Sequence, residues 1–395
     1  MLRFAVAIAR PVRKNGAPMP RRALPSQLAL LLPALLLAGC GGEPAAPPAQ
    51  PLTPAALAAV AEEPGVERAK LARAVDELFS REGIGETRAV VVMHAGEIAA
   101  ERYGAGYGPE TRFIGWSMSK TVTGVLIGMM VADGRLRLDD SPPIPNWQRA
   151  GDPRGEITLR QLLQMRSGLR HEEKAEPVYT SPEVRMMFLD GRDDMAGWAE
   201  AQPLESEPGR AFDYSTPSSM ILSDIAARVL APDGAPAERQ AAVADFLRAR
   251  LAVPLGMDTL VAEYDRAGTM MGGSMVWADA RDWARFGEFL RHKGSVAGSQ
   301  LVPRGWIEFM TGPSPRAPDY GALTWLNRAS GGEREVLFPG QGPASLFAAV
   351  GHLGQYVLVS PGQKLTVVRL GKTDDEDRKA LVAALAEIVE LYPET

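Results

Sequence analysis

FIGWSMSKTVTGVLIGMMVADGRLRLDD, residues 113–140, is the segment that most strongly determines how this chain folds. Its residues 119–132 are apolar almost all round, which is typical of a helix buried at the centre of a domain. Gly134 is placed to end that helix. Ser117 and Lys120 stand at its start, three residues apart and on one face, so the lysine amine can reach the serine hydroxyl.

The pairing of Ser117 with Lys120 is typical of nucleophilic catalysis. A serine hydroxyl is a poor nucleophile until a base takes its proton, and a lysine can be that base when its surroundings lower its pKa. The positive end of the helix dipole also lies near a developing oxyanion. The alternative Gly-x-Ser-x-Gly motif is absent, because Gly115-Trp-Ser-Met-Ser119 lacks the second glycine. A Ser-x-x-Lys pair alone is a weak signal, but this one opens the most apolar helix of the chain.

Strand patterns come from both ends of the chain, and helical patterns dominate its middle. An amphipathic helix is predicted over 66–80, and a β-hairpin over 88–103 with its turn at Ala95-Gly96. Three strands and a closing helix are predicted near the other end, over 345–350, 356–359, 365–370 and 377–391. We therefore expect an α+β fold, in which one antiparallel sheet built from both termini is flanked by helices, with an all-α insertion at about 135–265.

Four further stretches agree with residues 113–140 in order and spacing: ITLRQLLQMRSGL (157–169), PGRAFDYSTPSSMILSDIA (208–226), GGSMVWADARDWARFGEFL (272–290) and GHLGQYVLVSPGQKLTVVRLG (351–371). Together they resemble the serine β-lactamase and penicillin-binding-protein superfamily. The similar branch is the class C-like one, which includes 6-aminohexanoate-dimer hydrolases and family VIII carboxylesterases. The resemblance covers about residues 85–390 and implies a β-lactamase/transpeptidase-like fold with no metal or organic cofactor.

The resemblance also implies a second motif, a tyrosine that shares the proton-transfer work with the lysine. Here it reads Tyr214-Ser215-Thr216. Thr216 stands where true β-lactamases carry an asparagine that binds the substrate amide, and a hydroxyl cannot present both an NH₂ group and a carbonyl. We therefore expect Tyr214 to be catalytic, Thr216 to contact the substrate, and β-lactams to be poor substrates.

A third motif, Lys/His-Thr-Gly in much of the superfamily, lies on a strand beside the site. The nearest match is His352-Leu353-Gly354, either in register or shifted by one residue. The resemblance thus places His352 and Gly354 at the substrate, although a structural role for His352 stays open. The backbone N–H of Gln355 is our choice for the second oxyanion donor, beside that of Ser117.

Two other features have alternative interpretations. Glu172 and Glu173 could be imagined as a glycosidase pair, but adjacent carboxylates on a polar loop are usually solvated, and we expect that here. Trp325 resembles a family position near the strand edge and is expected to serve packing.

Composition excludes several classes of function. The net charge of −5, without a run of lysine and arginine interleaved with aromatic residues, argues against nucleic-acid binding. The single cysteine, Cys40, rules out an intrachain disulfide. The four histidines are too scattered in the sequence to suggest a zinc site.

The first residues resemble the leader of a bacterial lipoprotein. The apolar segment 28–37 is too short to remain as a membrane helix, and it ends in Leu37-Ala-Gly-Cys40, which matches a lipobox. We expect a signal peptide over 1–39, lipid attachment at Cys40, a Pro/Ala-rich tether over 40–64 and a hydrolase domain over 65–395. Gly41 is not the aspartate that retains many lipoproteins in the inner membrane, so a periplasm-facing outer-membrane location is favoured.

The predicted function is hydrolysis of a small-molecule ester or amide through an acyl-enzyme, by Ser117, Lys120 and Tyr214. A β-lactamase or D-Ala-D-Ala-type peptidase is the alternative among enzymes. An inactive envelope-binding lipoprotein is the alternative from another class, although the intact catalytic residues argue against it.

Overall fold

The computed structural model describes residues 51–394. The signal peptide predicted over 1–39 and the lipid-attachment residue Cys40 lie outside the described residues, as does Thr395.

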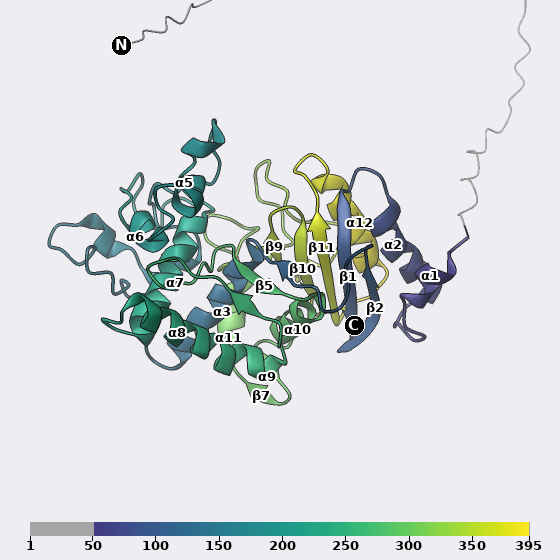
Figure 1. Cartoon of the computed structure of the whole chain (residues 1–395). Helices are drawn as coiled ribbons and strands as arrows, with labels where there is room; N and C mark the ends of the chain where they lie inside the picture. Colours follow the sequence, from purple (N-terminus) through teal and green to yellow (C-terminus); the bar gives the residue numbers. More distant parts are fainter. Residues whose placement is uncertain (1–50, 395) are drawn as a thin grey trace, which may run out of the picture. The chain divides into compact units, whose positions relative to one another are not determined.

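A six-stranded antiparallel sheet, in the order β2-β1-β11-β10-β9-β8, forms the frame of the molecule (Figure 1). As predicted, strands from both ends of the chain build it, because β1 pairs with β11 from Glu86 opposite Lys372 to His94 opposite Leu365. The strands are β1 (Glu86–His94), β2 (Glu97–Tyr103), β8 (Trp325–Leu326), β9 (Phe347–Gly351), β10 (Gln355–Ser360) and β11 (Leu365–Lys372). The predicted turn at Ala95-Gly96 has both residues at positive φ, as a tight hairpin requires.

Helices cover the two faces of this sheet. The predicted terminal helices are present as α2 (Arg68–Ser80) and α12 (Arg378–Glu390), which pack against each other, and α10 (Ala280–Arg291) contacts β1, β10 and β11. Figure 1 shows α2 and α12 together on one side of the sheet. Seven of the eight residues of β11 are buried, as expected for a strand covered on both faces.

The central helix α3 (Met118–Ala132) is buried along nearly its whole length. Two of its glycines let α11 (Arg304–Met310) approach closely. Trp306 Nε1 donates a hydrogen bond to the carbonyl of Gly124 at 3.0 Å, and a Cβ on Gly128 would lie 2.2 Å from the same nitrogen. These contacts fix α3, and with it Ser117 and Lys120, against the rest of the fold.

Nearly all the regular secondary structure of the region 135–265 is helical. Its helices are η1 (Pro153–Glu156), α4 (Leu159–Leu163), η2 (Val178–Thr180), α5 (Pro182–Phe188), α6 (Met195–Glu200), α7 (Thr216–Leu230), α8 (Pro236–Leu247), η3 (Arg248–Ala252) and α9 (Val253–Leu255). Two small sheets complete the structure, one of β3 (Phe113–Ile114), β4 (Val261–Ala262) and β5 (Val276–Ala278), the other of β6 (Ser295–Val296) and β7 (Ser299–Gln300).

The expected tether over 40–64 is partly folded. Helix α1 (Pro54–Ala58) begins at an N-cap, Thr53, whose side chain accepts a hydrogen bond from the N–H of Ala56. The chain then extends the sheet edge, since the Ala61 N–H donates to the Ala99 carbonyl at 2.9 Å. Ordered structure is thus present ahead of residue 65, the expected start of the hydrolase domain. Within residues 51–394, no helix has the length and apolarity that crossing a membrane requires.

Replacing Gly128 by valine should lower the free energy of unfolding by about 1–3 kcal/mol, because the new side chain overpacks the contact between α3 and Trp306. Chemical denaturation measures this change. Gly305→Ala is the matched control in α11, where a Cβ meets nothing within 4 Å and stability should hold or rise slightly. Equal stability of the two variants would show that α3 can move away from Trp306.

Candidate active site

Ser117 lies at the junction between strand β3 and helix α3. The Gly115 N–H donates to the Val276 carbonyl at 2.8 Å, which ties this junction to β5. Trp116 has φ of 46°, a left-handed conformation that is costly for a bulky residue and often occurs at functional sites. Ser117 is the N-cap of α3, and within residues 51–394 its backbone N–H has no hydrogen-bond acceptor. That N–H is free to bind an oxyanion.

The Lys120 amine is buried and makes three short contacts, with a side-chain exposure of 1%. Its Nζ lies 2.8 Å from Ser117 Oγ, 2.9 Å from Thr216 Oγ1 and 3.1 Å from the Gly273 carbonyl oxygen. A neutral amine has two protons and one lone pair. Since the Gly273 carbonyl can only accept, and Thr216 can accept the second proton, the lone pair is left for the hydroxyl proton of Ser117.

Tyr214 completes the group of predicted catalytic residues. Its ring centroid lies 4.9 Å from Lys120 Nζ, and its hydroxyl is near enough to Ser117 and Lys120 for both to lower its pKa. The ring of Trp325, expected to serve packing, lies 5.1 Å from that of Tyr214, and the ring of Tyr320 lies 5.8 Å away. Burial raises the pKa of Tyr214, although the Lys120 charge opposes this shift. The structure thus brings Ser117, Lys120 and Tyr214 together.

Thr216 is oriented differently from the expectation that it contacts the substrate. The residue is completely buried, and its hydroxyl oxygen accepts from Lys120. The same oxygen lies 2.9 Å from Glu173 Oε1 and 2.8 Å from Glu183 Oε1. With these partners around it, the Thr216 hydroxyl has no further site for a substrate.

Glu173 and Glu183 are site residues that the sequence analysis missed. Glu172 is exposed, as expected, but Glu173 turns inward. Glu173 Oε2 accepts from the Thr216 N–H at 2.8 Å, and Oε1 lies 4.0 Å from Lys120 Nζ. Burial raises the pKa of Glu173 to about 7; Lys120 opposes this shift and Glu183 adds to it. No local pattern identifies these residues, because both stand in polar segments and meet only in the folded chain.

The third motif also differs from the expectation. His352, Leu353 and Gly354 are not on a strand but form the turn between β9 and β10, where Leu353 and Gly354 have φ of 58° and 78°. His352 still lies near the nucleophile, since its exposed ring packs edge-on against Trp116 with centroids 5.5 Å apart. Gly354 faces away from Ser117, because a Cβ there would lie 2.7 Å from Arg369 and Leu381.

Gln355 holds this turn together. Its side-chain nitrogen donates to the carbonyls of His352, Leu353 and Gly371, and its side-chain oxygen accepts from the Gly371 N–H. Gln355 begins β10, which lies inside the sheet, whereas β9 is the strand next to the nucleophile. A Cβ on Gly351 of β9 would lie 2.2 Å from the carbonyl oxygen of Gly115. The second oxyanion donor is therefore expected on β9 and not at Gln355.

Gly273 is a further site residue without an assigned role in the sequence analysis. Its carbonyl holds Lys120, and a Cβ there would lie 2.7 Å from the Thr216 methyl group. A glycine is therefore needed at this position because helix α7 approaches the backbone closely.

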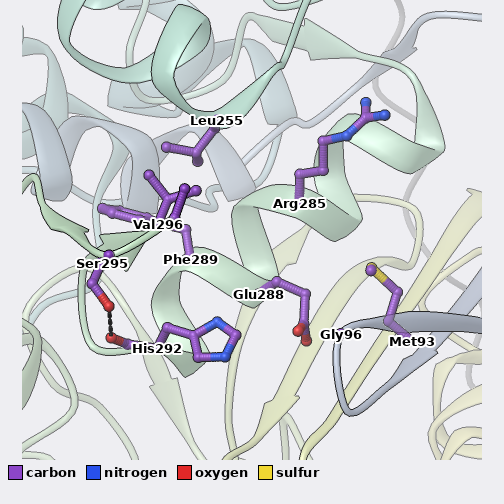
Figure 2. A pocket seen from close by; sticks show the side chains of 11 residues that line it. Met93, Gly96, Leu255, Arg285, Glu288, Phe289, His292, Ser295 and Val296 are labelled. Atoms are coloured by element: carbon purple, nitrogen blue, oxygen red, sulfur yellow. Dashed lines mark hydrogen bonds between the residues drawn. The ribbon is translucent and has the colours of Figure 1, made fainter.

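Elsewhere in the described part of the chain, no cluster of three or more His, Cys, Asp or Glu side chains is suited to a metal ion. A cavity of about 370 Å³ lies between α10 and the hairpin of β1 and β2 (Figure 2). Its charged lining residues have protein partners: Arg285 pairs with Asp282, and Glu288 pairs with Arg291. None of the catalytic residues lines it.

Known proteins resemble this chain over most of its length. The family model described as Beta-lactamase matches residues 72–390. A 6-aminohexanoate-dimer hydrolase from Paenarthrobacter ureafaciens is 25% identical over 345 residues, which are 83% of this chain and 82% of that protein.

Solved structures show the same fold at lower identity. A penicillin-binding-protein homologue from Caulobacter crescentus has a TM-score of 0.60 at 19% identity, covering 83% of this chain and 98% of its own. A family VIII carboxylesterase has a TM-score of 0.58 at 16% identity, covering 81% and 97%. The resemblance to this superfamily and the β-lactamase/transpeptidase-like fold are thereby confirmed.

Gly273→Ala should lower kcat by about 10- to 100-fold, because its methyl group displaces Thr216 and disturbs the acceptors that orient Lys120. Ester hydrolysis measures the loss. The double variant Gly273→Ala with Thr216→Ser removes the methyl group that clashes and keeps the hydroxyl, so it should recover most of the rate. A double variant as slow as Gly273→Ala alone would contradict this explanation.

Proposed function

The chain belongs to the beta-lactamase family and is a serine hydrolase, and we propose that it cleaves esters or small amides through an acyl-enzyme on Ser117. The main support for this proposal is the 2.8 Å contact between Lys120 Nζ and Ser117 Oγ, with the Tyr214 side chain close to both groups.

In the first step, Ser117 Oγ attacks the substrate carbonyl carbon while its proton passes to Lys120. The carbonyl oxygen becomes an oxyanion, which the Ser117 N–H and N–H groups of β9 bind. The N–H groups of β9 that are available lie beyond Ala348, because Ala348 is the last residue of β9 that pairs with β8. The bond to the leaving group then breaks, and the leaving group takes a proton through Tyr214, which Lys120 resupplies. Water repeats the sequence to release the acid and free Ser117.

The proposed substrate class rests on the second motif and on the relatives. Thr216 faces Lys120 and two carboxylates, so this position presents no amide to the substrate. The relatives include a hydrolase named for 6-aminohexanoate dimer, a linear amide, and a carboxylesterase. Both names favour small open-chain substrates over lactams.

A direct comparison of substrates tests this proposal. A short-chain nitrophenyl ester should leave an acyl group on Ser117, visible by mass spectrometry, and should turn over much faster than a chromogenic cephalosporin. A missing hydrogen bond to a buried substrate amide costs about 1–3 kcal/mol, or about 5- to 150-fold in rate.

Ser117→Ala is the control and should abolish both the adduct and turnover. Cephalosporin turnover as fast as ester turnover would favour the β-lactamase or peptidase alternative. A wild-type protein that forms no adduct with either compound would instead favour an inactive envelope-binding protein.

We further propose that the mature protein is anchored in the bacterial envelope by a lipid on Cys40 and faces the periplasm. The support is the sequence Leu37-Ala-Gly-Cys40 after an apolar segment, together with the single cysteine of the chain. With glycine at position 41, the outer membrane is the proposed destination where the cell has one.

Cys40→Ser should move the protein from the membrane fraction to the soluble fraction, or leave it unprocessed, because no thiol remains for lipid attachment. Fractionation and intact mass of the mature chain measure this. Cys40→Ser with unchanged membrane association and unchanged mature mass would refute the anchor.

A further inference from the structure

The carboxylates of Glu173 and Glu183 lie behind Lys120, on the side opposite the nucleophile. Thr216 Oγ1 contacts Lys120 Nζ and one carboxylate oxygen of each glutamate, at 2.8–2.9 Å. The order of contacts is therefore Ser117, Lys120, Thr216 and then the two glutamates. No step of the mechanism above uses these two residues.

Counting protons at Thr216 shows what charge the pair carries. A hydroxyl has one proton to donate and two lone pairs. When Lys120 donates into one lone pair, the hydroxyl proton can go to only one of the glutamates. The other contact is a hydrogen bond only if that glutamate is protonated and donates into the second lone pair. The two contacts thus place a carboxylate acceptor next to Thr216, and its negative charge is opposite in sign to that of a Lys120 ammonium.

The charge matters because Lys120 and Thr216 are buried, while the Glu173 side chain keeps 20% of its surface exposed. A buried ammonium is costly unless it is paired and hydrogen-bonded. Glu173 Oε1 lies 4.0 Å from Lys120 Nζ, and the Thr216 N–H fixes the same carboxylate from the start of α7. Glu183 reaches Thr216 from α5.

We propose, on the basis of the proposed acyl-transfer function, that Glu173 and Glu183 are positioning residues that act through Thr216 to stabilise Lys120 as the ammonium it becomes when it takes the Ser117 proton. The Ser117 O–H bond breaks, an N–H bond forms on Lys120, and the glutamates neither gain nor lose a proton. The role is that of the carboxylate behind the histidine in a Ser-His-Asp triad, here placed behind a lysine.

The pKa shifts give the sign of the expected pH effect. Burial lowers the pKa of Lys120, but the opposing charges of Tyr214, Glu173 and Glu183 outweigh it and raise the pKa overall. This direction is opposite to the lowering expected from the sequence, because the carboxylates that cause it have no local sequence signal. Without the two carboxylates, less negative charge counteracts the lowering of the pKa by burial, so the pKa of Lys120 should fall. The other titratable groups that interact with Glu173 are Asp213, Tyr320 and His352, and since the Glu173 charge raises the pKa of each, its removal should lower those pKa values too.

The test uses the full chain and the variant Glu173→Gln with Glu183→Gln. In ester hydrolysis the acidic limb of the pH–rate profile should move down by about 1–3 pH units, since an opposite charge at this distance shifts a pKa by that amount. The maximal rate should also fall by about 3- to 30-fold, because a weaker base accepts a proton more slowly. The position of the limb does not depend on how much of the variant is folded.

Matched variants separate this role from a structural one. Glu172→Gln changes the exposed neighbouring carboxylate, and it should leave both the acidic limb of the pH–rate profile and the maximal rate unchanged. Thr216→Ser keeps the hydroxyl, so the acidic limb should stay at the wild-type pH whatever the rate, and Thr216→Val should shift the limb in the same direction as the double glutamine variant. A lower rate with an unshifted limb in the double variant would overturn the proposal.

A second measurement does not need turnover. In protein labelled with ¹³C-lysine, the Lys120 side-chain resonance, assigned by its loss in Lys120→Met, should titrate about 1–3 pH units lower in the double glutamine variant. An unchanged titration midpoint would refute the role of the carboxylates. A wild-type protein that forms no acyl-Ser117 would instead refute the proposed function, so the two failures are distinguishable.

Discussion

The burial of one lysine amine sets the conditions that the rest of the site has to meet. Lys120 points into the protein from the first turn of α3, where water cannot solvate its charge. The chain supplies a partner on each side: Ser117 from the helix start, Gly273 from the segment before β5, and Thr216 from α7. Each partner comes from a different part of the sequence. The amine can therefore exist in this position only in the complete fold.

Because Lys120 needs partners from several parts of the chain, the helical region and the sheet region together form one catalytic site. Strand β5 and helix α10 support the junction that presents Ser117, while α7 brings Thr216, α5 brings Glu183 and the loop before η2 brings Glu173. Trp325, at the start of the short edge strand β8, holds the ring of Tyr214 from the sheet side. Aromatic contacts thus hold Tyr214, and polar contacts hold Lys120 beside it.

The parts of the fold and site that the sequence predicts are those with a local signal. The hairpin, the buried helix and the Ser117–Lys120 pair follow from spacing within a few residues, and Tyr214 follows from a motif. Glu173 has no such signal, because its partner Thr216 lies far along the chain and a polar loop gives no pattern. For the segment His352-Leu353-Gly354 the two lines of reasoning disagree: the resemblance places it on a strand, whereas the strands predicted over 345–350 and 356–359 leave it in a connection, as the structure has it. Helix α1 was missed because its Pro/Ala-rich composition outweighed the capping signal of Thr53 and Pro54.

The pairing of β1 with β11 has a consequence for how the molecule forms. The strand that begins at Glu86 has its long partner near Lys372, so the centre of the sheet closes only after almost the whole chain has been made. Until then, β1 and β2 form a two-stranded ribbon, which is at best marginally stable by itself. Such distant pairing slows folding, because a large loop must close before its contacts are gained. During synthesis the chain therefore exposes the apolar face of this hairpin for long enough that chaperone binding is physically favoured.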